Sequence, residues 1–370
     1  MREVDAAVVG AGVVGLAVAS AIARTGRSVV VLERESRVGC GITSRNSEVV
    51  HAGLYYPPSS LKARLCVEGR LALYAWCEER RVAYRKLGKL IVATHESEVE
   101  TLSAFLERGR ENSAGDLAWL EAEEVSRLEP AVRSVAAIHS PETGILDAQA
   151  FCVSLLADSE LHGAFFLPRH EVLSLSRGGP DWILEARLEG GDIQSLRCGS
   201  VVLAAGLFNE GLARQAGLDP EQHQFRQFPC KGDYFSLIPS APLKLQRLVY
   251  PLPSDAGLGI HATLDLSGAI RFGPDTEYVE DLNDWGVSAE KTSRFFRAIR
   301  RYIPSFQEDW IRPDYAGLRP KLAGPGEPFR DFLIDEPSPD QCPGLILCAG
   351  IESPGLTAAL AIGKRVAGLL

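Results

Sequence analysis

The sequence lacks the features that mark several protein classes. Its 39 Lys and Arg are outnumbered by 48 Asp and Glu, which gives a formal net charge of -9. A nucleic-acid surface needs a basic stripe to neutralise phosphates, so this balance argues against binding to DNA or RNA. No uninterrupted apolar run is long enough to span a bilayer. The chain also has no internal repeat at solenoid spacing and no low-complexity segment.

The eight cysteines include no C-x-x-C pair. Neither a zinc site nor a thioredoxin-like site is therefore indicated, and we expect no metal. Most of the cysteines lie inside apolar runs, as Cys348 does within residues 345–349. This pattern predicts small buried thiols in a reducing compartment.

The first apolar stretch, residues 6–23, has the composition of a signal peptide, but its acidic neighbours Glu3 and Asp5 do not fit one. Its three glycines also have a better explanation, given below. No clear basic amphipathic helix for a membrane surface is present. We therefore expect a cytoplasmic protein that contacts the inner membrane face at most peripherally.

Alternating strand and helix patterns at the two chain ends indicate a parallel sheet covered by helices. The expected strands are residues 6–9, 28–32, 200–203 and 345–348, and the expected helices are residues 13–25, 61–81, 148–157 and 355–366. Ser59 or Ser60 is the expected N-cap of the second helix, and Asp147 that of the third.

The middle of the chain has a different pattern. Residues 87–94, 232–237, 245–252 and 259–272 are expected as antiparallel strands, with a turn at 265–268, and residues 96–112 and 288–303 as amphipathic helices. We predict an α/β protein (α+β overall), in which a Rossmann-like nucleotide-binding domain carries an inserted substrate domain with a mixed antiparallel sheet. The first domain would comprise residues 1–85, 146–215 and 320–370, and the second residues 86–145 and 216–319.

A glycine-rich turn near the N-terminus carries the first functional signal. Gly10, Gly12 and Gly15 match G-x-G-x-x-G between an expected strand and an expected helix. The first glycine permits the tight turn, the second lets the backbone approach a pyrophosphate, and the third allows close packing of helix on strand. The phosphates then meet free N–H groups and the positive end of the helix dipole.

Glu33 strengthens this signal because it ends the next expected strand, with residues 16–32 between it and Gly15. A carboxylate at this place accepts hydrogen bonds from ribose hydroxyls and repels a 2′-phosphate. The two features together predict a dinucleotide site. A glycine-rich turn without a ligand is the alternative.

Three features favour FAD over NAD. The motif occurs once, which leaves no second Rossmann unit for a nicotinamide. Residues 201–206 form a strand and turn of the type that flanks a bound flavin nucleotide. Residues 348–357 form a strand, a glycine-rich turn and a second helix start, which would stabilise negative charge at the N1–C2 edge of a reduced flavin. An ordinary packing turn is the alternative for this last stretch.

Longer motifs extend the interpretation to most of the chain. They are residues 44–56 (SRNSEVVHAGLYY), 60–69, 88–90, 231–235, 271–274, 317–321 and 350–357. On these motifs the sequence resembles the D-amino-acid-oxidase-type superfamily of FAD enzymes, and within it the L-2-hydroxyglutarate dehydrogenases and oxidases. Two departures stand out: Glu48 occupies a position where the family pattern usually has Gly, and Asp233 one where it often has Glu.

The turns and the resemblance together give a set of expected FAD contacts. These are Gly10, Gly12, Val13, Val14, Gly15, Glu33, Arg34, Thr43, Ser44, Arg45, Asn46, Ser47, Val172, Ala205, Gly206, Arg319, Gly350, Glu352, Ser353, Gly355, Leu356 and Thr357.

Oxidation of a 2-hydroxy acid moves a hydride to flavin N5 and needs a base for the hydroxyl proton and an anchor for the carboxylate. A neutral imidazole is the natural base near pH 7, and there are seven histidines. His51 is the first candidate because the resemblance places the preceding segment along the flavin. His261 is the second, and Arg319 is the expected anchor because its fork binds a carboxylate through two hydrogen bonds. A structural histidine and an interdomain salt bridge are the alternatives.

Four further residues are candidates for contact with the substrate. Lys231 would supply a second cation for a dicarboxylate, and Tyr56, Lys89 and Tyr250 are weaker candidates. The leading function is oxidation of a small 2-hydroxy acid similar to L-2-hydroxyglutarate. The alternatives are an amino-acid oxidase that acts on a C–N bond and a non-catalytic flavin-binding protein. The electron acceptor could be oxygen, a quinone or an electron-transfer protein.

Overall fold

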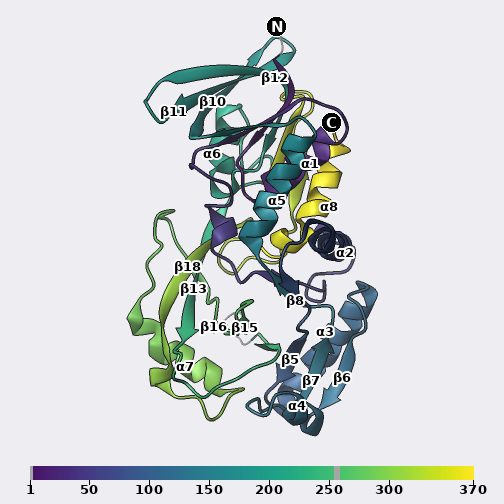
Figure 1. The fold of residues 1–370 in the computed structure, drawn as a ribbon, viewed down its shortest axis with the longest axis vertical. Helices are drawn as coiled ribbons and strands as arrows, with labels where there is room; N and C mark the ends of the chain where they lie inside the picture. Colours follow the sequence, from purple (N-terminus) through teal and green to yellow (C-terminus); the bar gives the residue numbers. More distant parts are fainter. Residues whose placement is uncertain (1–2, 254–258) are drawn as a thin grey trace.

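Two large β-sheets organise the chain, one in the upper half of Figure 1 and one in the lower half. The computed structural model describes residues 3–253 and 259–370. Strands β13 (Phe228–Leu237) and β18 (Ile311–Lys321) lead from the upper half into the lower one. No helix in the described ranges is long and apolar enough to cross a membrane.

The upper sheet brings the two chain ends together. Strand β1 (Val4–Val9) lies between β2 (Val29–Glu33) and β12 (Ile193–Leu203), and all three are parallel. Strand β9 (Phe165–Pro168) continues the sheet beside β2, and β20 (Leu345–Ala349) pairs with β12. The short β19 (Leu333–Asp335) adds an antiparallel edge. The predicted α/β fold with a parallel sheet from both chain ends is confirmed.

Three helices cover one face of this sheet, α1 (Val13–Ala23), α5 (Ala148–Leu161) and α8 (Gly355–Ala367). Helix α2 (Leu61–Arg80) packs against α8. Glycines let these helices approach closely: a Cβ on Gly363 of α8 would lie 2.3 Å from the carbonyl oxygen of Ala17 on α1. Side chains of α1 are buried nearly all round because the helix packs against the sheet, α5 and α8.

The other face is covered by strands that the sequence did not predict. Strands β10 (His170–Gly178) and β11 (Asp181–Leu188) continue antiparallel from β12 and enclose Trp182 together with α6 (Asn209–Gln215). Their exposed faces are polar, so the apolar signal in each strand is weak.

The lower sheet has the order β17-β13-β16-β15-β14-β5-β7-β6, with β18 also paired to β13. The further bounds are β5 (Lys89–Ala93), β6 (Ala118–Glu121), β7 (Ala136–Ser140), β14 (Leu248–Pro251), β15 (Ala262–Leu264), β16 (Ile270–Phe272) and β17 (Glu277–Tyr278). Helices α3 (Val99–Glu111), α4 (Ala122–Leu128) and α7 (Thr292–Arg300) pack against it.

One part of the predicted strand arrangement is wrong. Strands β5 and β14 are parallel, although all four predicted strands in this region were expected to be antiparallel. The chain between them passes through the upper sheet before it returns, and this long connection permits a parallel pairing. The predicted turn at 265–268 is present, because the Gly268 amide donates to the Asp265 carbonyl at 3.0 Å.

A small sheet of β3 (Val49–Val50), β8 (Gly144–Leu146) and β4 (Tyr84–Arg85) joins the two halves. The predicted boundaries at 145/146 and 319/320 fall inside the continuous strands β8 and β18. The division into a FAD-binding and a substrate domain remains our interpretation. Residues 1–2 of the first domain and residues 254–258 of the second lie outside the described residues.

Local capping follows the sequence closely. The Ser60 hydroxyl accepts from the Ala63 amide at 3.1 Å, so Ser60 and not Ser59 is the N-cap of α2. The Asp147 carboxylate accepts from the Ala150 amide at 2.8 Å at the start of α5. All eight cysteines are free thiols, and Cys40 alone among them is not fully buried.

The close packing of α1 on β1 gives a first testable prediction. A Cβ on Gly15 would lie 1.9 Å from the Gly10 carbonyl oxygen, a backbone atom that cannot turn aside. We expect Gly15→Ala to lower the free energy of unfolding by about 1–3 kcal/mol, as overpacked cores do, and to reduce bound FAD. Thermal unfolding and flavin absorbance of the purified protein measure both effects.

Gly190→Ala is the matched control, because no atom lies within 4 Å of its added Cβ and its φ is ordinary. Equal stability and equal flavin content in the two variants would show that α1 does not need this contact.

Candidate active site

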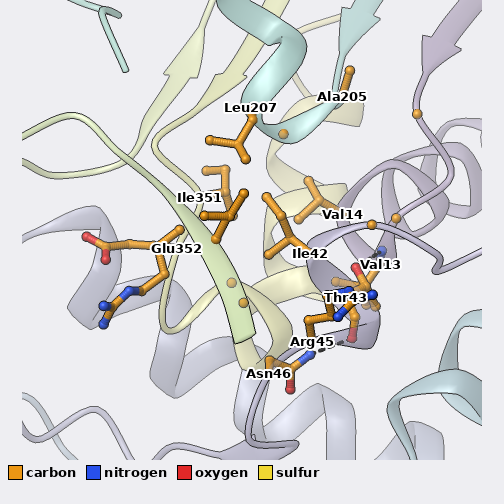
Figure 2. A pocket seen from close by; sticks show the side chains of 18 of the residues that line it. Val13, Val14, Ile42, Thr43, Arg45, Asn46, Ala205, Leu207, Ile351 and Glu352 are labelled. Atoms are coloured by element: carbon orange, nitrogen blue, oxygen red, sulfur yellow. Dashed lines mark hydrogen bonds between the residues drawn. The ribbon is translucent and has the colours of Figure 1, made fainter. Parts of the chain in front are cut away.

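A cavity of about 510 Å³ lies between the two sheets. The carboxyl ends of β1, β2, β12 and β20 form one side, and β13, β14 and β18 form the other. Figure 2 shows Val13, Thr43, Arg45 and Asn46 gathered on one side of it, with Ala205 and Leu207 above. Ligands of open α/β sheets bind at this end of the strands, so the position suits a nucleotide.

The glycine-rich turn is held as the sequence predicted. Gly10 has φ 101°, and an added Cβ would lie 2.7 Å from the Ala204 carbonyl oxygen. The Thr43 hydroxyl accepts from the Val13 amide at 3.1 Å. A Cβ on Gly12 would lie 3.2 Å from this hydroxyl. The backbone at Gly12 is therefore open to the cavity only because no side chain is present.

Glu33 lies at the rim of the cavity with a fixed orientation. One carboxylate oxygen accepts from the Ala11 amide at 2.7 Å and the other from the Glu35 amide at 2.9 Å. A carboxylate can accept about four hydrogen bonds, so each oxygen retains capacity for a ribose hydroxyl.

Asn209 was not among the predicted site residues, although it fixes the neighbouring turns. Its fully buried side chain accepts from the Ala205 amide at 2.7 Å and donates to the Cys348 carbonyl at 2.7 Å. It thereby joins the ends of β12 and β20 beside the cavity. An asparagine at a helix start is too common to indicate this role.

The C-terminal turn enters the cavity from β20. The Thr357 hydroxyl, on the first turn of α8, accepts from the His51 amide at 3.0 Å. Figure 2 shows Ile351 inside the cavity and Glu352 pointing away from it. The Glu352 carboxylate pairs with Lys62 at 2.9 Å and Lys321 at 3.6 Å. Burial alone would raise the pKa of Glu352, but these two cations hold it below its ordinary value.

The two predicted histidines both line the cavity. The His51 Nε2 lies 3.2 Å from the Ser353 hydroxyl, which in turn lies 3.2 Å from the Tyr56 hydroxyl. The His261 ring stacks on Tyr250, with ring centroids 3.6 Å apart and planes 6° from parallel.

Both imidazoles are neutral near pH 7. Burial lowers the pKa of His51 to about 3, and the positive charge of Lys89 adds to this effect. The same two causes, together with His51 and Arg319, hold the pKa of His261 well below its ordinary value. Each ring can therefore accept a proton, as a general base must.

Arg319 also lines the cavity, but part of its guanidinium is already engaged. Its Nη2 donates to the Lys231 carbonyl at 3.1 Å and the Asp275 carbonyl at 2.8 Å, and its Nε donates to the Cys230 carbonyl at 3.3 Å. Among the described residues it has no carboxylate partner. These bonds fix the plane of the guanidinium and leave Nη1 for an anion.

Both predicted substrate lysines lie outside the cavity lining. Lys231 is buried and pairs with Asp284 at 2.7 Å, so its charge already has a partner. Lys89 is 1% exposed and lies behind the wall, with its Nζ 4.4 Å from the Tyr55 ring centroid and 4.8 Å from that of Tyr250. Burial lowers the pKa of Lys89 to about 7.

Most of the predicted contacts are brought together in the lining. They are Gly10, Gly12, Val13, Val14, Glu33, Arg34, Thr43, Arg45, Asn46, Ser47, His51, Val172, Ala205, Gly206, Tyr250, His261, Arg319, Glu352, Ser353, Gly355, Leu356 and Thr357. The predicted residues outside the lining are Gly15, Ser44, Tyr56, Lys89, Lys231 and Gly350. Gly15 packs on Gly10, and the Ser44 hydroxyl donates to the Cys40 carbonyl instead.

Sequence reasoning missed the aromatic wall contributed by the lower sheet and its following loop. The Tyr234 hydroxyl lies 2.8 Å from the Ser47 hydroxyl, and the Arg45 guanidinium lies 4.6 Å from the Trp285 ring centroid. Gly317 passes so close to this segment that an added Cβ would lie 2.2 Å from the Arg45 carbonyl oxygen. These contacts join residues far apart in sequence, and no local pattern announces them.

Comparisons with known proteins give the family. The model described as "FAD dependent oxidoreductase" (DAO) matches residues 5–369. The chain belongs to this family of FAD-dependent oxidoreductases. The expected family and the expected cofactor are thereby confirmed.

Named relatives and solved structures agree with this assignment. The mitochondrial L-2-hydroxyglutarate dehydrogenase of Arabidopsis thaliana is 40% identical, over 99% of this chain and 83% of that protein. The L-2-hydroxyglutarate dehydrogenase of Escherichia coli strain K12 is 27% identical, over 98% of this chain and 92% of that protein. The FAD-bound L-alpha-glycerophosphate oxidase of Mycoplasma pneumoniae superposes with a TM-score of 0.89 at 25% identity, over 100% of this chain and 95% of that chain.

The residues present fit the family's cofactor. The backbone at Gly12 is open for a pyrophosphate, Glu33 is oriented for a ribose, and the first turn of α8 faces the cavity. The aromatic and apolar wall between the two sheets suits a flat ring system. FAD, when bound, supplies the hydride acceptor that these residues lack.

The buried Lys89 gives a prediction about stability and pH. Its pKa in the folded protein, about 7, lies below the 10.5 of an ordinary lysine. Between these values the unfolded chain binds one proton more than the folded one, so the lysine makes stability rise with pH. We expect Lys89→Met to be more stable than wild type, with the largest gain in melting temperature at pH 7. The gain in unfolding free energy should shrink by about 1.4 kcal/mol for each pH unit between pH 7 and pH 10.

Lys86→Met removes an exposed charge from the same segment and is the control, for which the difference from wild type should be flat with pH. A Lys89→Met difference that is equally flat would mean that burial does not lower the pKa of Lys89.

Proposed function

We propose that this protein is an FAD-dependent dehydrogenase or oxidase that converts a small 2-hydroxy acid, similar to L-2-hydroxyglutarate, to the 2-oxo acid. One observation carries the proposal. Two neutral imidazoles, His51 and His261, share the cofactor's cavity with Arg319, a cation that has no carboxylate partner among the described residues. The relatives named L-2-hydroxyglutarate dehydrogenase support the same substrate class.

Arg319 is the proposed anchor of the substrate's carboxylate. Three backbone carbonyls fix its guanidinium, so little side-chain entropy is lost when Nη1 binds an anion. The anchor orients the neighbouring hydroxyl and the hydrogen on Cα within a cavity whose wall is largely apolar. Exclusion of water there strengthens each electrostatic contact.

His51 is the proposed base. Its backbone is held by Thr357 on α8, which fixes the ring relative to the C-terminal turn. The neutral ring takes the proton of the substrate hydroxyl, and Ser353 and Tyr56 form a chain of hydroxyls through which that proton can leave. His261, stacked on Tyr250, is the second candidate for the base or a hydrogen-bond donor to the substrate.

The proposal leaves three classes of electron acceptor open. Oxygen, a quinone or an electron-transfer protein would each reoxidise the flavin. An amino-acid oxidase activity on the same scaffold is the second candidate, and the first experiment separates the two.

The substrate class is tested by anaerobic mixing of the FAD-loaded protein with organic acids and amino acids. We expect L-2-hydroxyglutarate to bleach the flavin absorbance, because a neutral base and a carboxylate anchor suit a hydroxy acid. Amino acids should leave the flavin oxidised. Bleaching by amino acids alone would support the C–N oxidase, and bleaching by neither class would contradict both activities.

The histidines are tested by His51→Gln and His261→Gln. Loss of a general base costs about 10²–10⁴-fold, so we expect at least a hundredfold slower flavin reduction in each variant with FAD still bound. Stopped-flow absorbance measures the rate. His223→Gln, outside the cavity lining, is the control. Near-normal rates in both cavity variants would overturn these roles.

A further inference from the structure

Three lysines are buried in the described part of the chain, and two of them have a carboxylate partner. Lys62 pairs with Glu352 at 2.9 Å, and Lys231 pairs with Asp284 at 2.7 Å. Lys89 is the most deeply buried of the three and has no carboxylate within 4.0 Å in the described ranges. Burial of an ammonium without a counter-charge is costly, and this cost lowers the pKa of Lys89 to about 7. An anion held nearby would favour the charged form of the lysine.

The surroundings of Lys89 contain further unsatisfied polar groups. Its Nζ lies over the rings of Tyr55 and Tyr250, at 4.4 and 4.8 Å from their centroids. The buried Tyr55 hydroxyl and the buried Nδ1 of His51 have no hydrogen-bond partner in the part of the chain that the structure describes. We call Lys89, Tyr55 and Tyr250 the lysine floor.

The lysine floor adjoins the cavity through Tyr250, whose ring also carries the stacked His261. Lys89 comes from β5, whereas Arg319 comes from β18, so the two cations reach the site from different parts of the lower sheet. Both charges lower the pKa of His261, which places that imidazole within the reach of each. A ligand beside the histidines therefore meets positive charge from two separate sources.

We infer that Lys89 is the specificity-determining cation of the site, and that its missing counter-ion is the second carboxylate of a dicarboxylic 2-hydroxy acid. Arg319 holds the carboxylate beside the reacting carbon. The lysine floor attracts the carboxylate at the other end across the Tyr250 ring, which lines the cavity and whose centroid lies 4.8 Å from the Lys89 Nζ. One aromatic ring would separate the ammonium from the carboxylate. In a buried site, water screens the attraction between these two charges only weakly. This inference rests on the proposed function.

The test compares two substrates of equal length, L-2-hydroxyglutarate and L-2-hydroxypentanoate, which differ by a carboxylate in place of a methyl group. We expect Lys89→Met to lower kcat/KM for the dicarboxylate on the order of a hundredfold and for the monocarboxylate less than about threefold. Lys86→Met, which removes a surface charge three residues away, should leave both values unchanged.

A binding measurement separates this inference from the proposed function. Calorimetric titration of the holoenzyme with glutarate and with pentanoate needs no turnover, and only the wild type should prefer glutarate. A wild-type flavin that no 2-hydroxy acid reduces would overturn the proposed function, whereas the glutarate preference would still report on Lys89. Equal losses for both acids in Lys89→Met, or no loss for either, would overturn the role of Lys89.

Discussion

A single buried hydroxyl joins the last helix of the chain to the segment that carries the proposed base. The Thr357 hydroxyl accepts from the His51 amide and donates to the Val49 carbonyl, at 3.0 and 3.3 Å. Thr357 can reach this segment because α8 lies close to its neighbours; a Cβ on Gly69 of α2 would lie 2.4 Å from the Thr357 carbonyl oxygen. The position of His51 therefore depends on helix packing as well as on its own loop.

The charges around the cavity divide into two kinds. Lys62 and Lys321 share the carboxylate of Glu352, and these ion pairs hold the C-terminal turn against α2 and β18. Arg319 and Lys89 have carbonyls and aromatic rings as neighbours instead of carboxylates. Carbonyl dipoles and ring faces orient a cation without cancelling its charge, so the site keeps a net attraction for anions.

The sequence predicted those parts of the site that depend on neighbouring residues. The turn at Gly10–Gly15, the carboxylate of Glu33 and the cap at Ser60 each follow from geometry within one strand, turn and helix. The choice between Lys231 and Lys89 could not be predicted in this way, because it depends on which lysine lies beside an acidic side chain in the folded protein. Asn209 and the parallel pairing of β5 with β14 were equally hidden, since both join segments separated by more than a hundred residues.

Glu48 shows how a departure from the family pattern can leave the chemistry unchanged. Its φ is 54°, in the left-handed region that favours glycine, which explains why the resemblance usually has Gly at this position. The glutamate side chain turns away from the cavity, and its carboxylate accepts from the Ala148 amide at 3.2 Å, at the first residue of α5. This bond satisfies a helix N–H that Asp147 does not reach, and it offsets backbone strain of about 1 kcal/mol. The departure nearest to His51 thus concerns the backbone and a helix end, and it lies outside the cavity lining.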